Sequence, residues 1–344
     1  MDSALEAAWA ASPLASAARL PQAYRAFGAA GGALSEQRTA ASGLAVAALA
    51  WLGRHAPDAF APLVRLPFAA RADWPPAAAK AFAVPTDRHF AADAAAWPVA
   101  PVVVSFTAES VRDPAYTRAM FVASPPDGTR AEGAPVRAEW GKYGEDRTIY
   151  TTAHFGGPEP RTTHLGVDVG APAGTPVHVP LDGVVHSVGR NAAAGDYGPT
   201  VVLRHEVEAV AAAAADGGGG APARAVFYSL YGHLSLSTLV TPDGTPRLVP
   251  GQRCRRGEVL GWVGDEAVNG GWPPHVHVQL VTDMGEWEGD FSGVCARSDW
   301  PAYAVLCPDA NLLLRCPFVA PVGWDASATG AGLAAVRVLV FSEQ

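Results

Sequence analysis

The sequence predicts a mainly β protein with a small helical region at its N-terminus. From about residue 147 onward, strand-like segments alternate with turns rich in glycine and proline, which is typical of strands joined by short loops. The first 65 residues are instead rich in alanine and leucine, which favour helix. With 344 residues and 49% hydrophobic content, the chain is large enough to bury a substantial core.

Two or three helices are expected within residues 1–65. Ser35, followed by Glu36 and Gln37, is an N-cap signal. An apolar face follows at helical spacing: Leu44, Ala48, Trp51 and Leu52. We interpret this region as a helical domain that packs on the rest of the chain, without a catalytic role.

Residues 66–134 are predicted to be a linker with a small α/β segment. The prolines that suit a linker are Pro67, Pro75, Pro76 and Pro85. A strand is expected at 102–106 and a short helix at 114–121. Nothing in this region indicates chemistry.

The main β domain is expected over residues 135–316. Its predicted strands are 147–154, 165–169, 177–188, 199–207, 225–233, 258–263 and 275–282. Residues 207–225 contain an alanine run and four consecutive glycines, which favours a flexible hairpin insertion. The tail, 317–344, is expected to add an edge strand at 336–341.

Chemistry-bearing residues gather in three clusters of this β region. His164 and Asp168 form the first, His233 the second, and His275 with His277 the third. The prolines before His275 exclude a helix there, and side chains alternate along a strand, so His275 and His277 share one face. Imidazole and carboxylate groups are the ligands of zinc sites that keep an open position.

The first cluster requires a bend in the chain. A glycine- and valine-rich stretch makes a poor helix, and on a straight strand His164 and Asp168 would stand roughly 13 Å apart. Both can bind one ion only if the chain turns between them. Gly166 is the expected position of that turn.

These motifs resemble the lysostaphin/LytM-type zinc metallopeptidases, peptidase family M23. The resemblance rests on His-x-x-x-Asp, Tyr231-Gly232-His233-Leu234 and His-x-His in this order, and covers about residues 135–315. It implies a duplicated-hairpin β-sandwich or barrel-sandwich core. It also implies that His164, Asp168 and His277 bind Zn²⁺, while His233 and His275 act on the attacking water and the developing oxyanion.

The sequence also resembles a divergent branch of this family, whose module lies in longer chains with a phosphotransferase and a class III aminotransferase. This likeness rests on two motifs, Lys142-Tyr143-Gly144-Glu145-Asp146-Arg147 and Asn269-Gly270-Gly271-Trp272-Pro273-Pro274-His275. Asn269 and Trp272 are predicted to bind substrate. The tyrosine that the peptidases commonly carry shortly before the first ligand is missing, and Arg161 is predicted either to contact substrate in its place or to form a surface salt bridge.

The leading hypothesis is a zinc-dependent amide hydrolase, a metalloendopeptidase acting on a peptide or small amide. The alternatives are a zinc hydrolase or lyase of a small metabolite, and a non-catalytic binding or regulatory module. A net charge of −8 gives no electrostatic case for nucleic acid or an anionic membrane. No secretory signal is recognised, so a cytoplasmic location is expected. The four cysteines lack metal-site spacing and are expected to be thiols.

Overall fold

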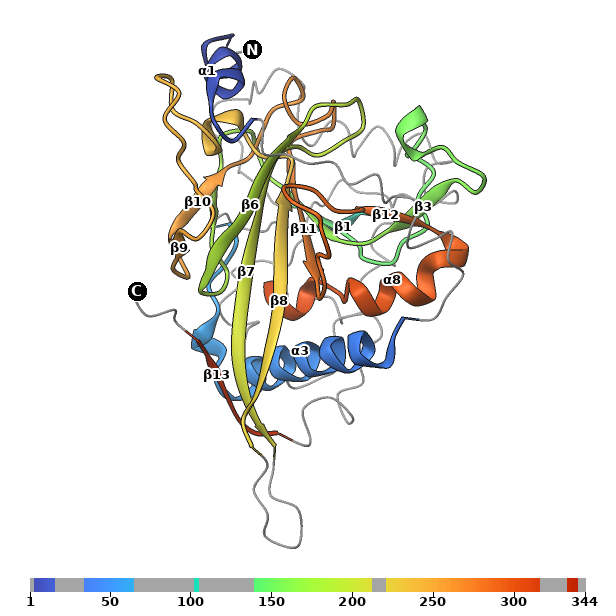
Figure 1. Cartoon of the computed structure of the whole chain (residues 1–344). Helices are drawn as coiled ribbons and strands as arrows, with labels where there is room; N and C mark the ends of the chain where they lie inside the picture. Colours follow the sequence, from blue (N-terminus) through green and yellow to red (C-terminus); the bar gives the residue numbers. More distant parts are fainter. Residues whose placement is uncertain are drawn as a thin grey trace, which may run out of the picture.

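The computed structural model describes residues 3–15, 34–64, 102–104, 139–211, 221–315 and 333–339. Strands dominate these residues, and the predicted mainly β class is confirmed. Figure 1 shows the long strands β6, β7 and β8 curving side by side through the molecule, with helix α3 crossing β7 and β8 near one end.

Nine strands of the described residues form one large sheet. Its neighbours pair antiparallel, apart from the parallel pair β1–β2. The order along the sheet is β1 (Val102–Val104), β2 (Glu139–Gly141), β4 (Val167–Gly170), β11 (His275–Val281), β8 (Ala223–Gly232), β7 (Gly198–Ala211), β6 (Gly183–Asn191) and β9 (Arg253–Cys254), while β13 (Leu333–Val338) pairs with β7.

Two strand pairs lie outside this sheet. β10 (Val259–Trp262) pairs with β5 (Pro176–His178), and β12 (Val294–Ala296) pairs with β3 (Arg161–His164). The second pair matters for function because it carries His164 to the edge of the large sheet. Single 3-10 turns occupy η1 (Pro57–Ala59), η2 (Ala153–Phe155), η3 (Leu236–Thr238) and η4 (Arg297–Asp299).

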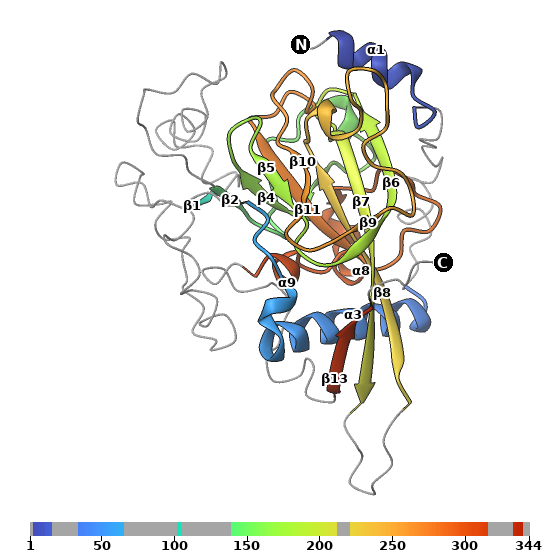
Figure 2. The same ribbon diagram turned by 90° about the vertical axis from the view of Figure 1, so that its left-hand side faces the viewer.

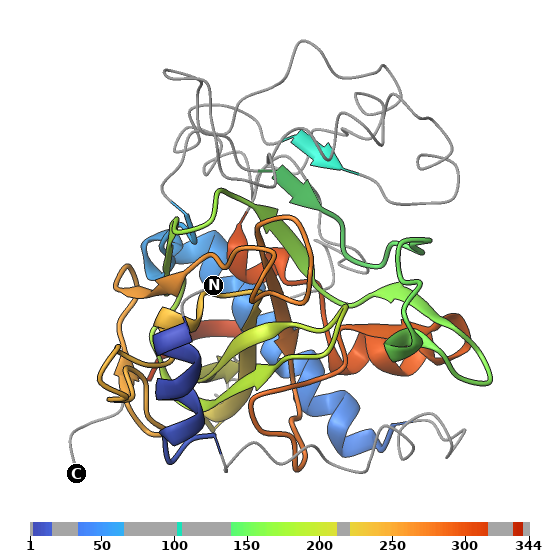
Figure 3. The same cartoon turned by 90° about the horizontal axis from the view of Figure 1, so that it is seen from above.

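Four α-helices are described: α1 (Ser3–Ala11), α3 (Glu36–His55), α8 (Trp300–Leu306) and α9 (Asn311–Leu314). Ser35 caps α3 by accepting a hydrogen bond from the Arg38 amide, as predicted. Figure 2 shows α3 lying across β7, β8 and β13. In Figure 1, α1 lies at the top of the molecule and α3 near the bottom, so in the view from above α1 lies in front of the strands and α3 behind them (Figure 3).

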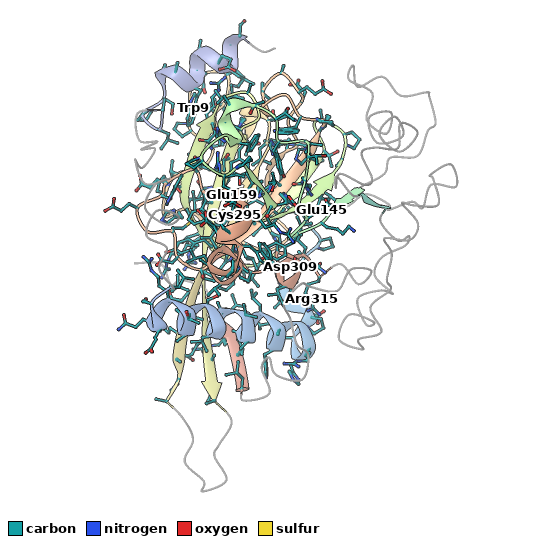
Figure 4. All side chains as sticks on the ribbon, turned by 90° about the vertical axis from the view of Figure 1, so that its right-hand side faces the viewer. Trp9, Glu145, Glu159, Cys295, Asp309 and Arg315 are labelled. Atoms are coloured by element: carbon teal, nitrogen blue, oxygen red, sulfur yellow. The ribbon has the colours of Figure 1, made fainter. Side chains whose placement is uncertain are left out.

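The helical region shares its core with the β domain. Trp9 of α1 and Leu49 of α3 belong to the same buried cluster as the strand residues Val201 and Val276. In Figure 4, Trp9 lies at one end of the molecule and Arg315 at the other, beside α3. The described helices α1 and α3 therefore pack on the β domain.

The structure corrects several predicted elements. Residues 147–154 form no strand: the chain loops, and the Arg147 side chain turns into the core to reach two carboxylates. The predicted strand 177–188 is broken into β5 and β6, while β3 and β12 were missed because their short segments lack an alternating pattern. The strand at 102–106 is present as β1, and the helix at 114–121 lies outside the described residues.

The supposed hairpin insertion is shorter than predicted. β7 continues to Ala211 and β8 starts at Ala223, so both ends of residues 207–225 are paired strand, and β13 pairs with Ala211 as well. The ends of this segment were misread because alanine gives no strand signal, although the backbones of Ala209 and Ala211 pair with neighbouring strands. The tail strand is confirmed but begins earlier, at Leu333.

Candidate metal centre

The chain bends between His164 and Asp168, as the sequence predicts. β3 ends at His164 in one strand pair, and β4 carries Asp168 in the large sheet, with Leu165 and Gly166 between them. A Cβ atom on Gly166 would lie 2.4 Å from Cε1 of His277, so this position has no room for a side chain. The bend brings Oδ1 of Asp168 to 3.3 Å from Nε2 of His164.

Strand register brings the third predicted ligand to the same place. In the large sheet His277 of β11 stands opposite Asp168 of β4. Nδ1 of His277 lies 3.1 Å from Oδ1 of Asp168 and 3.0 Å from Nε2 of His164. Among the described residues, this is the group of histidine, cysteine and acidic side chains that could hold a metal ion, with donor atoms all within 4.8 Å of one another.

The three donors fit a zinc ion in chemistry and in size. Zinc in proteins takes imidazole nitrogens and carboxylate oxygens at about 2.0–2.2 Å in a tetrahedral arrangement, which spaces ligand atoms about 3.3 Å apart. The observed separations of 3.0, 3.1 and 3.3 Å match that spacing. Three protein ligands leave one tetrahedral position for water or substrate.

The hydrogen bonds of the two ligand rings turn their lone pairs toward this point. His164 donates from Nδ1 to the carbonyl of Lys142, 2.9 Å away, and so leaves Nε2 unprotonated. His277 donates from Nε2 to Oε1 of Gln279, 3.0 Å away, and so leaves Nδ1 unprotonated. The Gln279 amide is oriented by its own donation to the carbonyl of Ser292. Two nitrogen lone pairs and a carboxylate oxygen thus face one another, an arrangement that a cation stabilises.

Charge and burial keep these groups in their metal-binding forms. Burial, together with the positive Arg147, lowers the pKa of His164 to about 4. Although burial opposes ionisation of Asp168, His164 and Arg147 hold its pKa well below the ordinary value. The neutral imidazole and the ionised carboxylate are the forms that bind zinc.

The two predicted catalytic histidines stack beside the ligands. The ring centroids of His233 and His275 lie 4.2 Å apart, and Nε2 of His275 is 3.8 Å from Oδ1 of Asp168. His233 donates from Nδ1 to the carbonyl of Asn269 and His275 from Nδ1 to that of Pro273. Each ring therefore presents an unprotonated Nε2 as a proton acceptor. Burial lowers the pKa of both, which keeps them neutral at neutral pH.

His233 lies just beyond the end of β8 in a left-handed backbone conformation, with φ of 60°. This region is unfavourable for a residue with a side chain, and such strain gathers at functional sites. The amide of His233 donates to the carbonyl of Tyr197, and its own carbonyl accepts from Gly264. These bonds hold the strained turn and aim the ring at His275.

The predicted substrate-binding residues lie in two different settings. Asn269 is fully buried, and its amide makes both of its bonds to the backbone of Trp272. Trp272 is partly exposed and contacts the rings of Tyr150 and Phe155. The Arg161 guanidinium lies 5.8 Å from the Phe155 ring centroid and donates to the carbonyl of His154. A substrate contact stays a prediction for all three; the structure adds that Asn269 supports His233.

Four residues around the ligands were not predicted. Arg147 binds Asp168, Gln279 binds His277, Tyr197 donates to Gln279, and Tyr150 accepts from Arg147. Gln279 had a usable signal, because it shares a strand face with His275 and His277. Arg147 and Tyr150 come from an irregular loop, where the spacing of residues in the sequence does not indicate where their side chains point.

His205 and three cysteines among the described residues have structural surroundings. His205 is fully buried and bonds to the Asp182 carbonyl and the Ser229 hydroxyl, as expected for a supporting strand residue. Cys254, Cys295 and Cys307 are buried free thiols. Burial raises the pKa of the Cys254 and Cys295 thiols to about 12, so they are unreactive.

Comparison with known proteins gives a partial match. No protein-family model matches the sequence. The DD-carboxypeptidase/endopeptidase Mpg of Neisseria meningitidis serogroup B is 33% identical over 116 residues, which is 34% of this chain and 19% of that protein. The chain thus spans about a fifth of the length of this curated relative. The predicted resemblance to bacterial peptidases is confirmed over those residues.

Solved peptidase structures are also similar. The catalytic domain of lysostaphin from Staphylococcus simulans matches at 23% identity over 43% of this chain and 86% of that chain, with a TM-score of 0.25. A putative peptidase M23 from Pseudomonas aeruginosa matches at 24% identity over 49% of this chain and 53% of that chain, also at 0.25.

No helix in the described part of the chain combines the length and the apolar character that crossing a membrane requires.

Proposed function

We propose that this protein is a zinc-dependent amide hydrolase of the peptidase class. The observation that carries the proposal is the triangle of facing acceptor atoms from His164, Asp168 and His277, each held in its metal-binding form. These three residues would be the ligands. A bound zinc ion supplies Lewis-acid chemistry, since it lowers the pKa of water to about 7 and polarises a carbonyl group.

His233 and His275 would move the protons of the reaction. Nε2 of His275 lies 3.8 Å from Oδ1 of Asp168, and the His233 ring lies beside it with its own Nε2 unprotonated, so either ring could accept a proton from the attacking water. A ring that has accepted the proton becomes a donor to the leaving amine or to the oxyanion. The Nδ1 bonds to the backbone hold both rings in this orientation throughout.

The substrate would approach across Asp168 and His275. Their side chains are 14% and 16% exposed, whereas His164 and His277 are 2% and 3% exposed. Partly exposed Trp272 and Tyr150 lie in one aromatic cluster with Phe155 beside this opening. A peptide or small amide with apolar groups fits such a surface better than a nucleic acid does.

Metal content and peptide cleavage test the proposal together. Purified protein should contain close to one zinc per chain and cleave members of a peptide panel, and a chelator should remove both properties. The panel includes glycine-rich peptides and peptides with bonds between D-amino acids, because the curated relative is named a DD-carboxypeptidase/endopeptidase. Full zinc without cleavage of any peptide in the panel would count against a peptidase.

A further inference from the structure

Arg147 lies buried behind the ligands, with its side chain 2% exposed. Its guanidinium donates in three directions. Nε reaches Glu145 at 3.0 Å, Nη1 reaches Asp168 at 2.5 Å and Tyr150 at 3.1 Å, and Nη2 reaches the carbonyl of Lys142 at 3.2 Å. The planar fork of arginine can satisfy such a divergent set, whereas the single ammonium of lysine cannot.

The charge of Arg147 is balanced inside the protein. Burial alone would lower its pKa, but Tyr150, Asp168 and Glu145 raise it above the ordinary value, so the group stays charged. A buried charge without partners is costly, and here two carboxylates offset that cost. Arg147 is therefore a permanent positive charge in contact with a metal ligand.

The two oxygens of Asp168 are divided between different partners. Oδ2 binds Arg147, while Oδ1 faces His164 at 3.3 Å and His277 at 3.1 Å. We propose that Arg147 is a positioning residue of the metal site, which holds Oδ2 and makes Asp168 bind the ion through Oδ1 alone. One-oxygen binding keeps the site four-coordinate, with its fourth position free for water or substrate.

Arg147 also reaches a second ligand through the backbone. The carbonyl of Lys142 accepts from Nη2 of Arg147 and from Nδ1 of His164. The same guanidinium thus fixes the carboxylate of one ligand and the hydrogen-bond acceptor of another. Partners of this kind orient metal ligands and set the affinity of the site.

The neighbouring strand leaves room for this contact. Gly141 of β2 stands opposite Asp168 of β4. A Cβ atom at Gly141 would lie 2.9 Å from Nη2 of Arg147 and 3.1 Å from Oδ2 of Asp168. The absence of a side chain there allows the guanidinium and the carboxylate to meet.

The inference rests on the proposed function, since it assigns a role within the same metal site. Its test compares Arg147→Lys and Arg147→Met with the wild type, and uses Arg190→Met as the matched control. Arg190 pairs with Glu6 at 2.6 Å, away from the ligands. Zinc affinity is measured by competition with a chromophoric chelator, and coordination number by the visible absorption of the Co²⁺-loaded proteins.

Both Arg147 variants should bind zinc about 10- to 100-fold more weakly, as is typical when the partner of a metal ligand is removed. Their Co²⁺ absorption should also weaken, because a released Asp168 can bind through both oxygens and raise the coordination number. Arg190→Met should match the wild type in both measurements. A merely structural arginine would change neither the affinity of the folded protein nor the Co²⁺ spectrum.

Each outcome separates the inference from the proposed function. If the wild type binds no zinc, the proposed function fails. If the wild type binds zinc and Arg147→Lys matches it in affinity and spectrum, the positioning role alone is overturned. If Arg147→Met does not fold, the double variant Glu145→Gln/Arg147→Met, which also removes the negative charge of Glu145, takes its place. Failure of Arg147→Lys and the double variant to fold would make Arg147 a residue of the fold and overturn the inference.

Discussion

His164 and His277 face each other through opposite ring nitrogens, with Nε2 of the first 3.0 Å from Nδ1 of the second. The choice of nitrogen follows from the partners behind each ring, the Lys142 carbonyl for His164 and the Gln279 amide for His277. Because neither facing nitrogen carries a proton, a cation between them stabilises the pair. The following predictions depend on this relationship.

Replacement of any ligand by alanine should remove zinc and activity together. In His164→Ala, Asp168→Ala or His277→Ala, the ion loses one protein bond and the remaining buried polar groups lose their partner. Zinc per chain, measured by atomic emission, should fall well below one. His186→Ala, on β6, is the control and should keep its zinc. Full zinc occupancy with full activity in Asp168→Ala would show that the ligand assignment is wrong.

Gln279→Leu should weaken zinc binding about 10- to 100-fold, because Nε2 of His277 loses the acceptor that fixes its tautomer. Competition with a chelator measures the change. Asn191→Leu is the matched control, since it removes another buried side-chain amide, one that donates to the Thr200 hydroxyl and the Gly289 carbonyl instead of contacting His277. An equal loss in both variants would contradict a specific role for Gln279.

His233→Ala and His275→Ala should keep zinc near one per chain while turnover falls about 100-fold or more, the scale of losing a general base or an oxyanion donor. Since the two rings stack 4.2 Å apart and act as one unit, the double variant should be little worse than either single one. Steady-state kinetics gives the turnover, and metal analysis of the same samples gives the zinc per chain. Zinc lost in step with activity would instead identify that histidine as a ligand.

His205 should make the fold sensitive to acid. Burial lowers its pKa to about 4, whereas in the unfolded chain a histidine titrates near pH 6.5, so the unfolded state binds more protons between these values. The stability that His205 contributes is complete above pH 6.5 and declines as the pH falls toward 4, by on the order of 3 kcal/mol in total. In urea unfolding with a chelator present, the free energy of unfolding of His205→Gln should decrease less than that of the wild type as the pH falls.

The control for His205 is His55→Gln, on the exposed end of α3. Its free energy of unfolding should follow the wild-type pH dependence. Histidines of the metal centre contribute equally in all three proteins and cancel in the comparison. If the free energy of unfolding of His205→Gln depends on pH as steeply as that of the wild type, the buried ring is not responsible for the acid sensitivity.

The sequence by itself determined the class of fold and pointed to the residues of the candidate metal centre. Strand-like segments that alternate with glycine- and proline-rich turns indicated the β domain. Two prolines precede His275 and exclude a helix there, so His275 and His277 were expected on one face of a strand. The bend at Gly166 followed from distance alone, because a straight strand separates His164 from Asp168 too widely for one ion. These conclusions depend on local geometry, which short stretches of sequence specify.

Only the tertiary structure decided what surrounds those residues. The partners of Asp168, His277 and His233 are Arg147, Gln279 and the Asn269 carbonyl, each brought by a different segment. Arg147 was expected on a strand, but it lies in a loop that turns its side chain inward to Asp168. A hydrogen bond between distant segments depends on sheet register and loop direction, and neither is encoded in the spacing of the residues that meet. The sequence could therefore pick out the candidate ligands but not the contacts that fix their ring nitrogens and carboxylate oxygens.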